Sequence, residues 1–519
     1  MPPSTRIYLK VPSLKKQMFS IKDFTPRAYQ ENILKTTKER NTLVCLPTGT
    51  GKTKNAILLA VHRLNTFPNT KVIILSPTKP LSNQICEECK SSTTIPVSQI
   101  NLLTGMIKPE ERKKLFEHSL IIVATPQTIA NDSKNNLISL KDTSLLVIDE
   151  CHRSKQRFAN TIVASQYMQQ TQYPRILALT ASPGATKEKI QEICRNLHVE
   201  DVEIRTEQDE DVLPYMQKKE MEYIKLDLPA EIKEAAALIT DVYQEKLRML
   251  KSFGVTKPTT LINKRDMLLL QKRFQGELKR GNKRAFAALS LVAQVIKLSY
   301  LLELVETQSI KAAEKYIAKL RGETSKAAKA ILNHAKIQAL LAKIENLKQT
   351  HHPKLLKTRE IIAEMLQHNS NAKAIVFANY RSTVDELKEL LSTVPGAKPT
   401  ILVGQKLGFS QKEQLQIIDK FNNNFCNVLI ATSVGEEGIS IGSLDLAVFY
   451  DHSGSEIRKI QRSGRVGRIK PGKVIYLAAK GTRDEAMLWT SVRKERKMQN
   501  ILRLMKQKIE KQQMLFPQK

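Results

Sequence analysis

Eight residues near the start of the chain, 46–53, combine the residue types that bind a polyphosphate. They follow a short apolar run, 42–45, and precede a segment with helical spacing, 55–63. Where a strand turns through glycines into a helix, successive backbone N–H groups face an anion. The glycines let the backbone wrap the phosphates, the lysine adds a positive charge, and the last threonine offers a hydroxyl to Mg²⁺. The residues assigned to this phosphate loop are Thr48, Gly49, Thr50, Gly51, Lys52 and Thr53. A glycine-containing turn without a ligand is the alternative.

A second stretch supplies the carboxylates that nucleotide hydrolysis requires. The apolar run 145–148 is typical of a strand buried on both faces, and Asp149, Glu150, Cys151 and His152 follow it directly. A doubly wound sheet places its ligand chemistry at the carboxyl ends of its strands. We therefore expect Asp149 to hold Mg²⁺ through water and Glu150 to orient and deprotonate the attacking water.

Two further segments complete the predicted nucleotide site. Arg27 and Gln30 lie in a helical stretch just before the phosphate loop, where an amide with both a donor and an acceptor suits an adenine edge. Much later, residues 461–468 place three arginines at three-residue spacing on one helix face. We expect Arg465 and Arg468 to act as arginine fingers on the γ-phosphate, with nucleic-acid phosphate binding by this helix as the alternative.

Strands and helices alternate before residue 228 and again after residue 351, which predicts two α/β parallel sheets. Small polar residues and backbone N–H groups at the strand ends suit contact with a sugar-phosphate backbone. We expect such contacts from a set of strand-end residues. The set is Thr78, Lys79, Thr104, Gly105, Thr125, Asn379, Arg381, Gly404, Gln405 and Thr432.

Between the two α/β regions, from 230 to about 350, strand-like runs disappear and apolar residues fall at helical spacing. The same region carries clustered lysines and arginines with few acids. Such clusters release counterions from phosphates, which favours a helical domain that grips a duplex. The residues expected to do so are Lys272, Arg273, Lys279 and Arg280. A solvated helical linker is the alternative.

Length and composition agree with a multidomain protein that has a polyanionic partner. The chain has 519 residues, more than one core accommodates, so two to four domains are expected. It carries 83 Lys and Arg against 51 Asp and Glu, a net charge of +32. The six cysteines are scattered, and Cys86 with Cys89 is interpreted as two thiols on a helix. No apolar run has the pattern of a membrane span or a signal core, so we expect an intracellular protein without a membrane partner.

The ordered set of Gln30, 47–53, 149–152, 180–182, 432–438 and 461–468 resembles the superfamily 2 helicases. Within them, the chain is similar to the archaeal Hef, FANCM and Mph branch through 404–414, 431–438, 455–458 and 302–308. The resemblance implies two RecA-like parallel-sheet domains with an all-helical, thumb-like insert that grips DNA. It also implies ATP and Mg²⁺ as cofactors, and it assigns Gly435 and Gln461 to the nucleotide site.

The resemblance further implies ATP-dependent helicase or translocase activity on forks, Holliday junctions and displacement loops, in the repair of stalled replication forks. In an archaeon the protein would act in the cytoplasm or nucleoid. We expect a first helicase domain at 1–228, the helical insert at 229–350, a second helicase domain at 351–490 and a basic C-terminal helix at 491–519.

Departures from this branch keep other interpretations open. Cys151 gives the sequence Asp-Glu-Cys-His, as in Dicer and the RNA-sensor helicases, and favours a double-stranded-RNA-stimulated ATPase. Hef proteins commonly continue into an XPF-like nuclease, whereas the chain ends at Lys519, so no nuclease activity is predicted. Residues 512–516 weakly resemble a sliding-clamp peptide without its aromatic pair, which makes a clamp a secondary partner. A third interpretation is a non-enzymatic DNA-binding scaffold, which the intact Lys52 and Glu150 disfavour.

Overall fold

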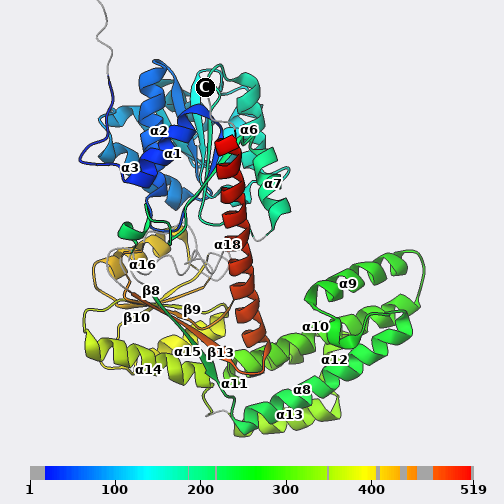
Figure 1. The fold of residues 1–519 in the computed structure, drawn as a ribbon. Helices are drawn as coiled ribbons and strands as arrows, with labels where there is room; N and C mark the ends of the chain where they lie inside the picture. The colour runs from blue at the N-terminus through cyan, green and yellow to red at the C-terminus, as the bar shows by residue number, and fades with distance from the viewer. Residues whose placement is uncertain are drawn as a thin grey trace, which may run out of the picture. The chain divides into compact units, whose positions relative to one another are not determined.

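The structure is a computed structural model, and it describes residues 18–184, 186–216, 219–347, 350–404, 409–432, 441–442, 444–452 and 472–515. The chain divides into two compact units, Met1–Tyr215 with Asn500–Lys519, and Met216–Gln499. Figure 1 shows the course of the chain through them.

The first unit is built on a seven-stranded, all-parallel sheet in the order β3-β4-β2-β5-β6-β1-β7. Most of its strands are buried along their whole length because both faces of the sheet are covered, which explains their unbroken apolar sequences. The strands are β1 (Thr42–Cys45), β2 (Lys71–Leu75), β3 (Ile100–Leu103), β4 (Ile121–Ala124), β5 (Thr143–Ile148), β6 (Ile176–Thr180) and β7 (Asp201–Ile204).

Helices follow the strands in alternation, and those that contact the sheet include α2, α3 and α6. The helices of this unit are α1 (Ala28–Glu39), α2 (Lys52–Thr66), α3 (Lys79–Ser92), α4 (Pro109–His118), α5 (Pro126–Lys134), α6 (Ala159–Gln170) and α7 (Lys187–Asn196). Cys86 and Cys89 lie buried on α3, as the sequence suggested. The apolar runs at 42–45 and 145–148 are confirmed as strands β1 and β5, whereas β3 and β7 were not predicted.

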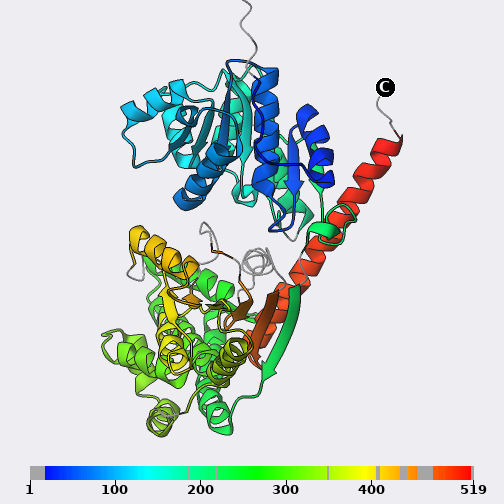
Figure 2. The ribbon, with the colours of Figure 1, turned by 90° about the vertical axis from the view of Figure 1, so that its left-hand side faces the viewer.

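The second unit contains a second all-parallel sheet, in the order β10-β11-β9-β12-β13-β8. Its strands are β8 (Lys219–Leu226), β9 (Ala374–Phe377), β10 (Pro399–Leu402), β11 (Val428–Ala431), β12 (Leu446–Phe449) and β13 (Gly472–Ala479). The helices that accompany them are α14 (Pro353–His368), α15 (Arg381–Leu391), α16 (Gln411–Asn422) and α18 (Arg483–Leu515). Figure 2 shows α18 as one long helix. The predicted C-terminal helix at 491–519 therefore begins earlier, at Arg483.

Strand β8 corrects the predicted boundary of the first domain at Leu228. It comes before the helical region in the chain, yet it pairs with β13 along its whole length, from Lys219↔Gly472 to Leu226↔Ala479. As an edge strand it is covered less than the central strands, and its sequence mixes polar residues with Met221, Tyr223, Ile224 and Leu226, none of which is fully buried. The second sheet is thus assembled from segments on both sides of the helical region.

The helical region is a bundle of α8 (Ala230–Met249), α9 (Lys264–Lys279), α10 (Arg284–Thr307), α11 (Ile310–Arg321), α12 (Lys326–Leu332) and α13 (Ala335–Asn346). This confirms the all-helical insert. Its core runs along α8 and α10, where Ile239, Val242, Leu298 and Leu302 pack together. A smaller cluster around Phe274 joins α9 to the start of α10.

Helix α10 alone among the described helices is long and apolar enough to cross a membrane by length and composition. This differs from the expectation that no apolar run reaches such a length. The helix contacts α8, α9, α11 and α12, so its apolar surface is used in the centre of the bundle.

Candidate nucleotide site

The phosphate loop lies between β1 and α2, and its backbone has the shape that its glycines permit. Gly49 and Gly51 have φ angles of +85° and +74°, in the left-handed region that side chains other than glycine rarely adopt. Gly51 caps α2 at its N-terminus. A Cβ atom at Gly51 would lie 3.2 Å from Nε2 of Gln30, so any side chain there would press on the Gln30 amide. Lys52 donates through Nζ to the carbonyl oxygens of Leu46 and Pro47, at 3.5 and 3.4 Å.

The segment before α1 is attached directly to this loop. Oε1 of Gln30 accepts from the backbone N–H of Arg27 at 3.0 Å, which fixes the amide, and Gln30 is 1% exposed. The hydroxyl of Tyr29 donates to the carbonyl oxygen of Thr50 at 2.5 Å. The guanidinium of Arg27 lies 4.5 Å from the ring centroid of Tyr215. Arg27 and Gln30 are therefore adjacent to the loop, as an adenine-reading role requires.

The predicted hydrolysis carboxylates stand at the carboxyl end of β5. Glu150 has a φ angle of +50°, a strained conformation for a glutamate that turns the chain sharply after the strand. Its Oε2 lies 3.2 Å from Nδ1 of His152, and the same nitrogen lies 3.2 Å from the hydroxyl of Thr180 at the end of β6. Because β6 lies between β5 and β1, Thr180 stands between the carboxylates and the phosphate loop along the sheet edge.

The two carboxylates have different acidities. Burial and the adjacent charge of Glu150 raise the pKa of Asp149 to about 7. Burial also acts to raise the pKa of Glu150, but the contact with His152 and the nearby charges of Lys52 and Arg153 outweigh it and lower that pKa. Glu150 is therefore kept ionised, which is the state that a general base needs. A cation beside Asp149 would ionise that carboxyl group as well.

The residues present fit a magnesium ion that is shared with a nucleotide. Mg²⁺ is commonly held by one or two carboxylates together with substrate phosphates. Asp149 and the hydroxyl of Thr53 are oxygen donors of this kind. The described part of the chain holds no group of three or more His, Cys, Asp and Glu side chains that could hold a metal by themselves. A magnesium ion here would thus depend on the phosphates for most of its ligands.

Sequence reasoning missed two contributors to this site. Tyr29 connects the Arg27–Gln30 segment to the loop, and His152 holds Glu150 while it contacts Thr180. Both residues stand within motifs that the sequence analysis identified. Their residue types alone, however, do not predict which groups they contact. Cys151 is fully buried, and burial raises the pKa of its thiol well above the usual range.

The predicted nucleic-acid residues of the first unit lie at the ends of neighbouring strands. In the register of the sheet, Leu75, Leu103 and Ala124 stand side by side at the ends of β2, β3 and β4. Thr78 precedes α3, which begins at Lys79, and Thr125 precedes α5. Thr104 and Gly105 follow β3 directly. The structure therefore brings this set to the sheet edge that carries Asp149, and DNA contact by them stays a prediction.

In the second unit, the corresponding positions are also neighbours. Phe377, Leu402 and Ala431 align at the ends of β9, β10 and β11, one or two residues before Asn379, Gly404 and Thr432. Arg381 begins α15 and pairs with Asp385 at 3.0 Å. Five predicted site residues lie outside the described residues, so their roles stay predictions. They are Gln405, Gly435, Gln461, Arg465 and Arg468.

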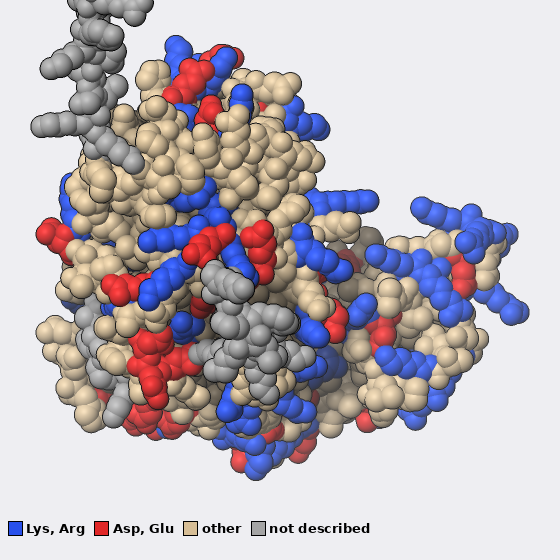
Figure 3. All heavy atoms as spheres, turned by 45° about the horizontal axis from the view of Figure 1, so that its top comes forward, with Lys and Arg blue, Asp and Glu red and all other residues tan. Residues whose placement is uncertain are grey.

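The four predicted cations of the insert lie at the C-terminal half of α9 or just beyond it, and all are exposed or partly exposed. Arg273 pairs with Glu277 at 2.9 Å and donates to the carbonyl oxygen of Gly254, so part of its charge is already used. Figure 3 shows lysine and arginine side chains gathered over the helical bundle, with few acids among them.

Three family models match successive parts of the chain. They are "DEAD/DEAH box helicase" over residues 27–190, "Putative ATP-dependent RNA helicase, helical bundle" over 231–351, and "Helicase conserved C-terminal domain" over 357–470. The helical-bundle model agrees with the bundle of α8 to α13. The first model covers β1 to β6 and ends before β7, and the last covers β9 to β12 without β13 or β8.

Individual relatives cover nearly the whole chain. "Putative ATP-dependent RNA helicase MJ1505" of Methanocaldococcus jannaschii is 38% identical over 494 residues, which cover 93% of this chain and 61% of the relative. "ATP-dependent DNA helicase mph1" of Neurospora crassa is 33% identical over 516 residues, 93% of this chain and 44% of the relative. The chain thus spans 44% to 61% of the length of these two relatives.

Among solved structures, the Hef helicase domain of Pyrococcus furiosus is similar, with 41% identity and a TM-score of 0.72. The match covers 90% of this chain and 98% of that one. The alignment therefore takes in most of the chain that forms the two sheets and the bundle. The chain belongs to the ATP-dependent superfamily 2 helicases, in the branch that contains Hef, FANCM and Mph.

Proposed function

We propose that the protein is an ATP-driven helicase or translocase that acts on branched DNA, such as forks and Holliday junctions, in replication-fork repair. The observation that carries the hydrolytic part is the position of Gln30, the phosphate loop and Glu150 at one edge of the first sheet. Glu150 takes the proton of the attacking water, Lys52 binds the phosphate oxygens, and Asp149 with Thr53 would hold Mg²⁺. The bound magnesium would neutralise the charge that develops on the phosphates. Arg465 and Arg468 would supply positive charge to the γ-phosphate.

The outward face of α9 supports a nucleic-acid partner. Helical spacing places Arg265, Lys272 and Lys279 on one side, opposite the buried Met267 and Phe274. The cations on this face reach solvent, where they can replace counterions along a phosphate backbone. Such contacts give affinity and position without reading the base sequence. The interaction would therefore suit a protein that recognises the shape of a junction.

A double-stranded-RNA-stimulated ATPase is the second candidate. Cys151 in the Asp-Glu-Cys-His sequence favours it, and one relative carries an RNA helicase name. The Mph1 relative is named a DNA helicase and the solved structure is of Hef, which favours DNA. The buried position of Cys151 weakens its value as an indicator, because a thiol with no exposed surface cannot touch either nucleic acid.

ATP hydrolysis measured with single strands, duplex, fork and four-way junction, each in DNA and RNA, tests the proposal. We expect forked and four-way DNA to stimulate hydrolysis most. Greater stimulation by duplex RNA would instead support the second candidate, a double-stranded-RNA-stimulated ATPase. A Lys52→Ala protein that hydrolyses ATP as fast as the wild type would instead restore the scaffold interpretation.

The contribution of α9 can be tested by its salt dependence. Neutralising Lys272, Arg273, Lys279 and Arg280 together should flatten the plot of log binding constant against log salt, by about 0.9 for each phosphate that the variant no longer neutralises. A matched control neutralises four lysines elsewhere in the second unit, Lys343, Lys357, Lys388 and Lys398. An unchanged slope in the α9 variant would mean that the DNA track lies on another surface.

A further inference from the structure

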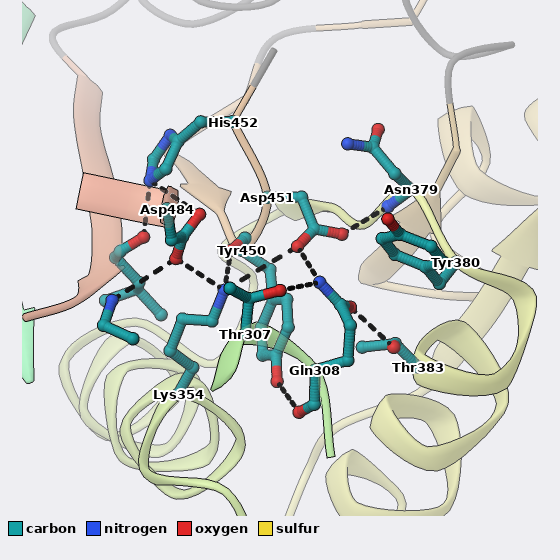
Figure 4. A network of polar contacts seen from close by, with 12 residues as sticks. Thr307, Gln308, Lys354, Asn379, Tyr380, Thr383, Tyr450, Asp451, His452 and Asp484 are labelled. Carbon is teal, nitrogen blue, oxygen red and sulfur yellow. Dashed lines mark hydrogen bonds and ion pairs between the residues drawn. The ribbon is translucent and has the colours of Figure 1, made fainter. Parts of the chain in front are cut away.

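A fully buried lysine, Lys354, lies in the first turn of α14 and is 0% exposed. Its Nζ donates to Oδ2 of Asp484 and to the carbonyl oxygen of Tyr450, each at 2.8 Å. It lies 3.7 Å from Oδ1 of Asp451 and 4.3 Å from the centroid of the Tyr450 ring. The ammonium group is therefore fully coordinated by the protein, and Figure 4 shows it at the centre of a polar network.

Asp451 is the second centre of this network, and it stands just after β12. Its Oδ1 accepts from Nε2 of Gln308 at 2.7 Å, and its Oδ2 accepts from the backbone N–H of Asn379 at 2.6 Å. Gln308 is 1% exposed. Its Oε1 accepts from the hydroxyl of Thr383, and its backbone oxygen accepts from the hydroxyl of Tyr450, both at 2.8 Å.

These contacts join parts of the second unit that are far apart in the sequence. Gln308 caps the C-terminus of α10, the central helix of the bundle. Asn379 and Thr383 belong to the turn between β9 and α15 and to the first turn of that helix, where we predict nucleic-acid contacts. In Figure 4, the side chain of Gln308 points between Asp451 and Thr383. One buried carboxylate is thus held both by the bundle and by the turn at the sheet edge.

An apolar contact would tolerate small rotations of the bundle, whereas a buried network of this kind is satisfied in one arrangement only. The Gln308 amide uses both its donor and its acceptor, so a shift of α10 would leave Asp451 or Thr383 without this partner. A movement of the bundle would therefore break bonds that join α10 to the Asn379–Arg381 turn and to the end of β12.

We propose that the Gln308–Asp451 contact is a positioning element that couples nucleic-acid binding on the helical bundle to the rate of ATP hydrolysis. Gln308 touches no nucleotide in this role; it acts through Asp451, which sets the position of Asn379. The inference rests on the proposed function, because it requires hydrolysis to be stimulated by nucleic acid.

The test compares Gln308→Leu with Ser309→Ala in the full chain. Leucine keeps similar volume and removes the side-chain bonds to Asp451 and Thr383. Ser309 is the matched control because its hydroxyl also joins the bundle to the second sheet region, through Glu386 at 2.6 Å, without touching Asp451. For each protein, hydrolysis is measured with and without forked DNA, together with KM for ATP, DNA affinity and the thermal unfolding midpoint.

We expect Gln308→Leu to keep the basal rate and DNA affinity and to lose about tenfold in the DNA-stimulated kcat, in the range of coupling between distant sites. Ser309→Ala should still be stimulated by DNA, even if its unfolding midpoint falls as much as that of Gln308→Leu. If DNA stimulates the wild type and Gln308→Leu equally, the inference about Gln308 is wrong, whereas the proposed function still stands. A wild-type protein that no nucleic acid stimulates overturns the proposed function as well.

Exchanging the amide of Gln308 with the carboxylate of Asp451 distinguishes a positioning role from a simple loss of packing. Gln308→Glu alone places two carboxylates together and should abolish stimulation. Combining it with Asp451→Asn restores a hydrogen bond with its donor and acceptor reversed, while an oxygen remains for the Asn379 N–H. The double variant should regain much of the stimulated kcat, and a double variant no better than Gln308→Glu would contradict the proposal.

Discussion

The two sheets share a parallel architecture, yet the lysines at their carboxyl edges are used in opposite ways. Lys52 is bonded to loop carbonyl oxygens at 3.4 and 3.5 Å, beside a carboxylate whose pKa burial has raised. Lys354 has two partners at 2.8 Å and no exposed surface. The edge of the first sheet is therefore suited to bind a charged ligand. At the edge of the second sheet, the charge of Lys354 is neutralised by buried groups of the protein itself.

The largest expected effect concerns the first edge. Glu150→Gln should bind ATP and reduce hydrolysis about 10²- to 10⁴-fold, because the attacking water loses its base. Single-turnover hydrolysis and nucleotide binding measure the two properties separately. Glutamine keeps the volume of Glu150 and an oxygen that can accept from His152, so we expect the unfolding midpoint to fall only slightly. Near-normal turnover would show that the Glu150 carboxylate is not the base. The first edge could then no longer be contrasted with the second as a catalytic one.

The second expected effect is on stability and concerns the second edge. Lys354→Met removes the cation while Asp451 and Asp484 stay buried, which should cost about 3–5 kcal/mol of unfolding free energy. Denaturant titration of the full chain measures it, and Lys52→Ala serves as the control that should lose hydrolysis with little change in stability. If Lys354→Met were as stable as the wild type, the second edge would not depend on internal neutralisation.

A smaller, pH-dependent effect is expected from Glu306, near the C-terminus of α10. Burial raises the pKa of this carboxyl group to about 7. A group with a raised acid pKa destabilises the folded state as pH rises from its unfolded-state pKa to that value, because the unfolded chain loses its proton more readily. Between about pH 4 and pH 8.5, wild-type stability should fall by about 1–3 kcal/mol more than that of Glu306→Gln. Parallel curves for the two proteins would show that Glu306 titrates normally.

The smallest effect tests whether Cys151 has any part in substrate choice. Cys151→Ala leaves a small buried cavity, which should cost about 1 kcal/mol of unfolding free energy. The ratio of DNA-stimulated to RNA-stimulated hydrolysis should stay within about twofold of the wild type, because the thiol is buried. A changed ratio would connect the position to the nucleic-acid track and strengthen the RNA interpretation.

The sequence predicted the first edge well because its chemistry is local. Gly49, Gly51 and Lys52 lie in one loop, and Asp149 with Glu150 directly follows an apolar run. The network at the second edge was not predicted, because Gln308, Lys354 and Asp451 are brought together only by folding and none stands in a recognisable spacing. Strand β8 was missed for a related reason: its mixed polar and apolar sequence has no clear strand pattern, and its partner β13 lies on the far side of the helical region in the chain.

Strand β8 also determines where the chain can be divided. The bundle leaves the second sheet after Leu226 and returns to it at Pro353, so it is an insertion within one domain rather than a link between two. A fragment that began at residue 229 would lack β8 and leave the backbone of β13 unpaired along one side, a template for aggregation. Separately expressed halves of this protein should therefore be divided near residue 216.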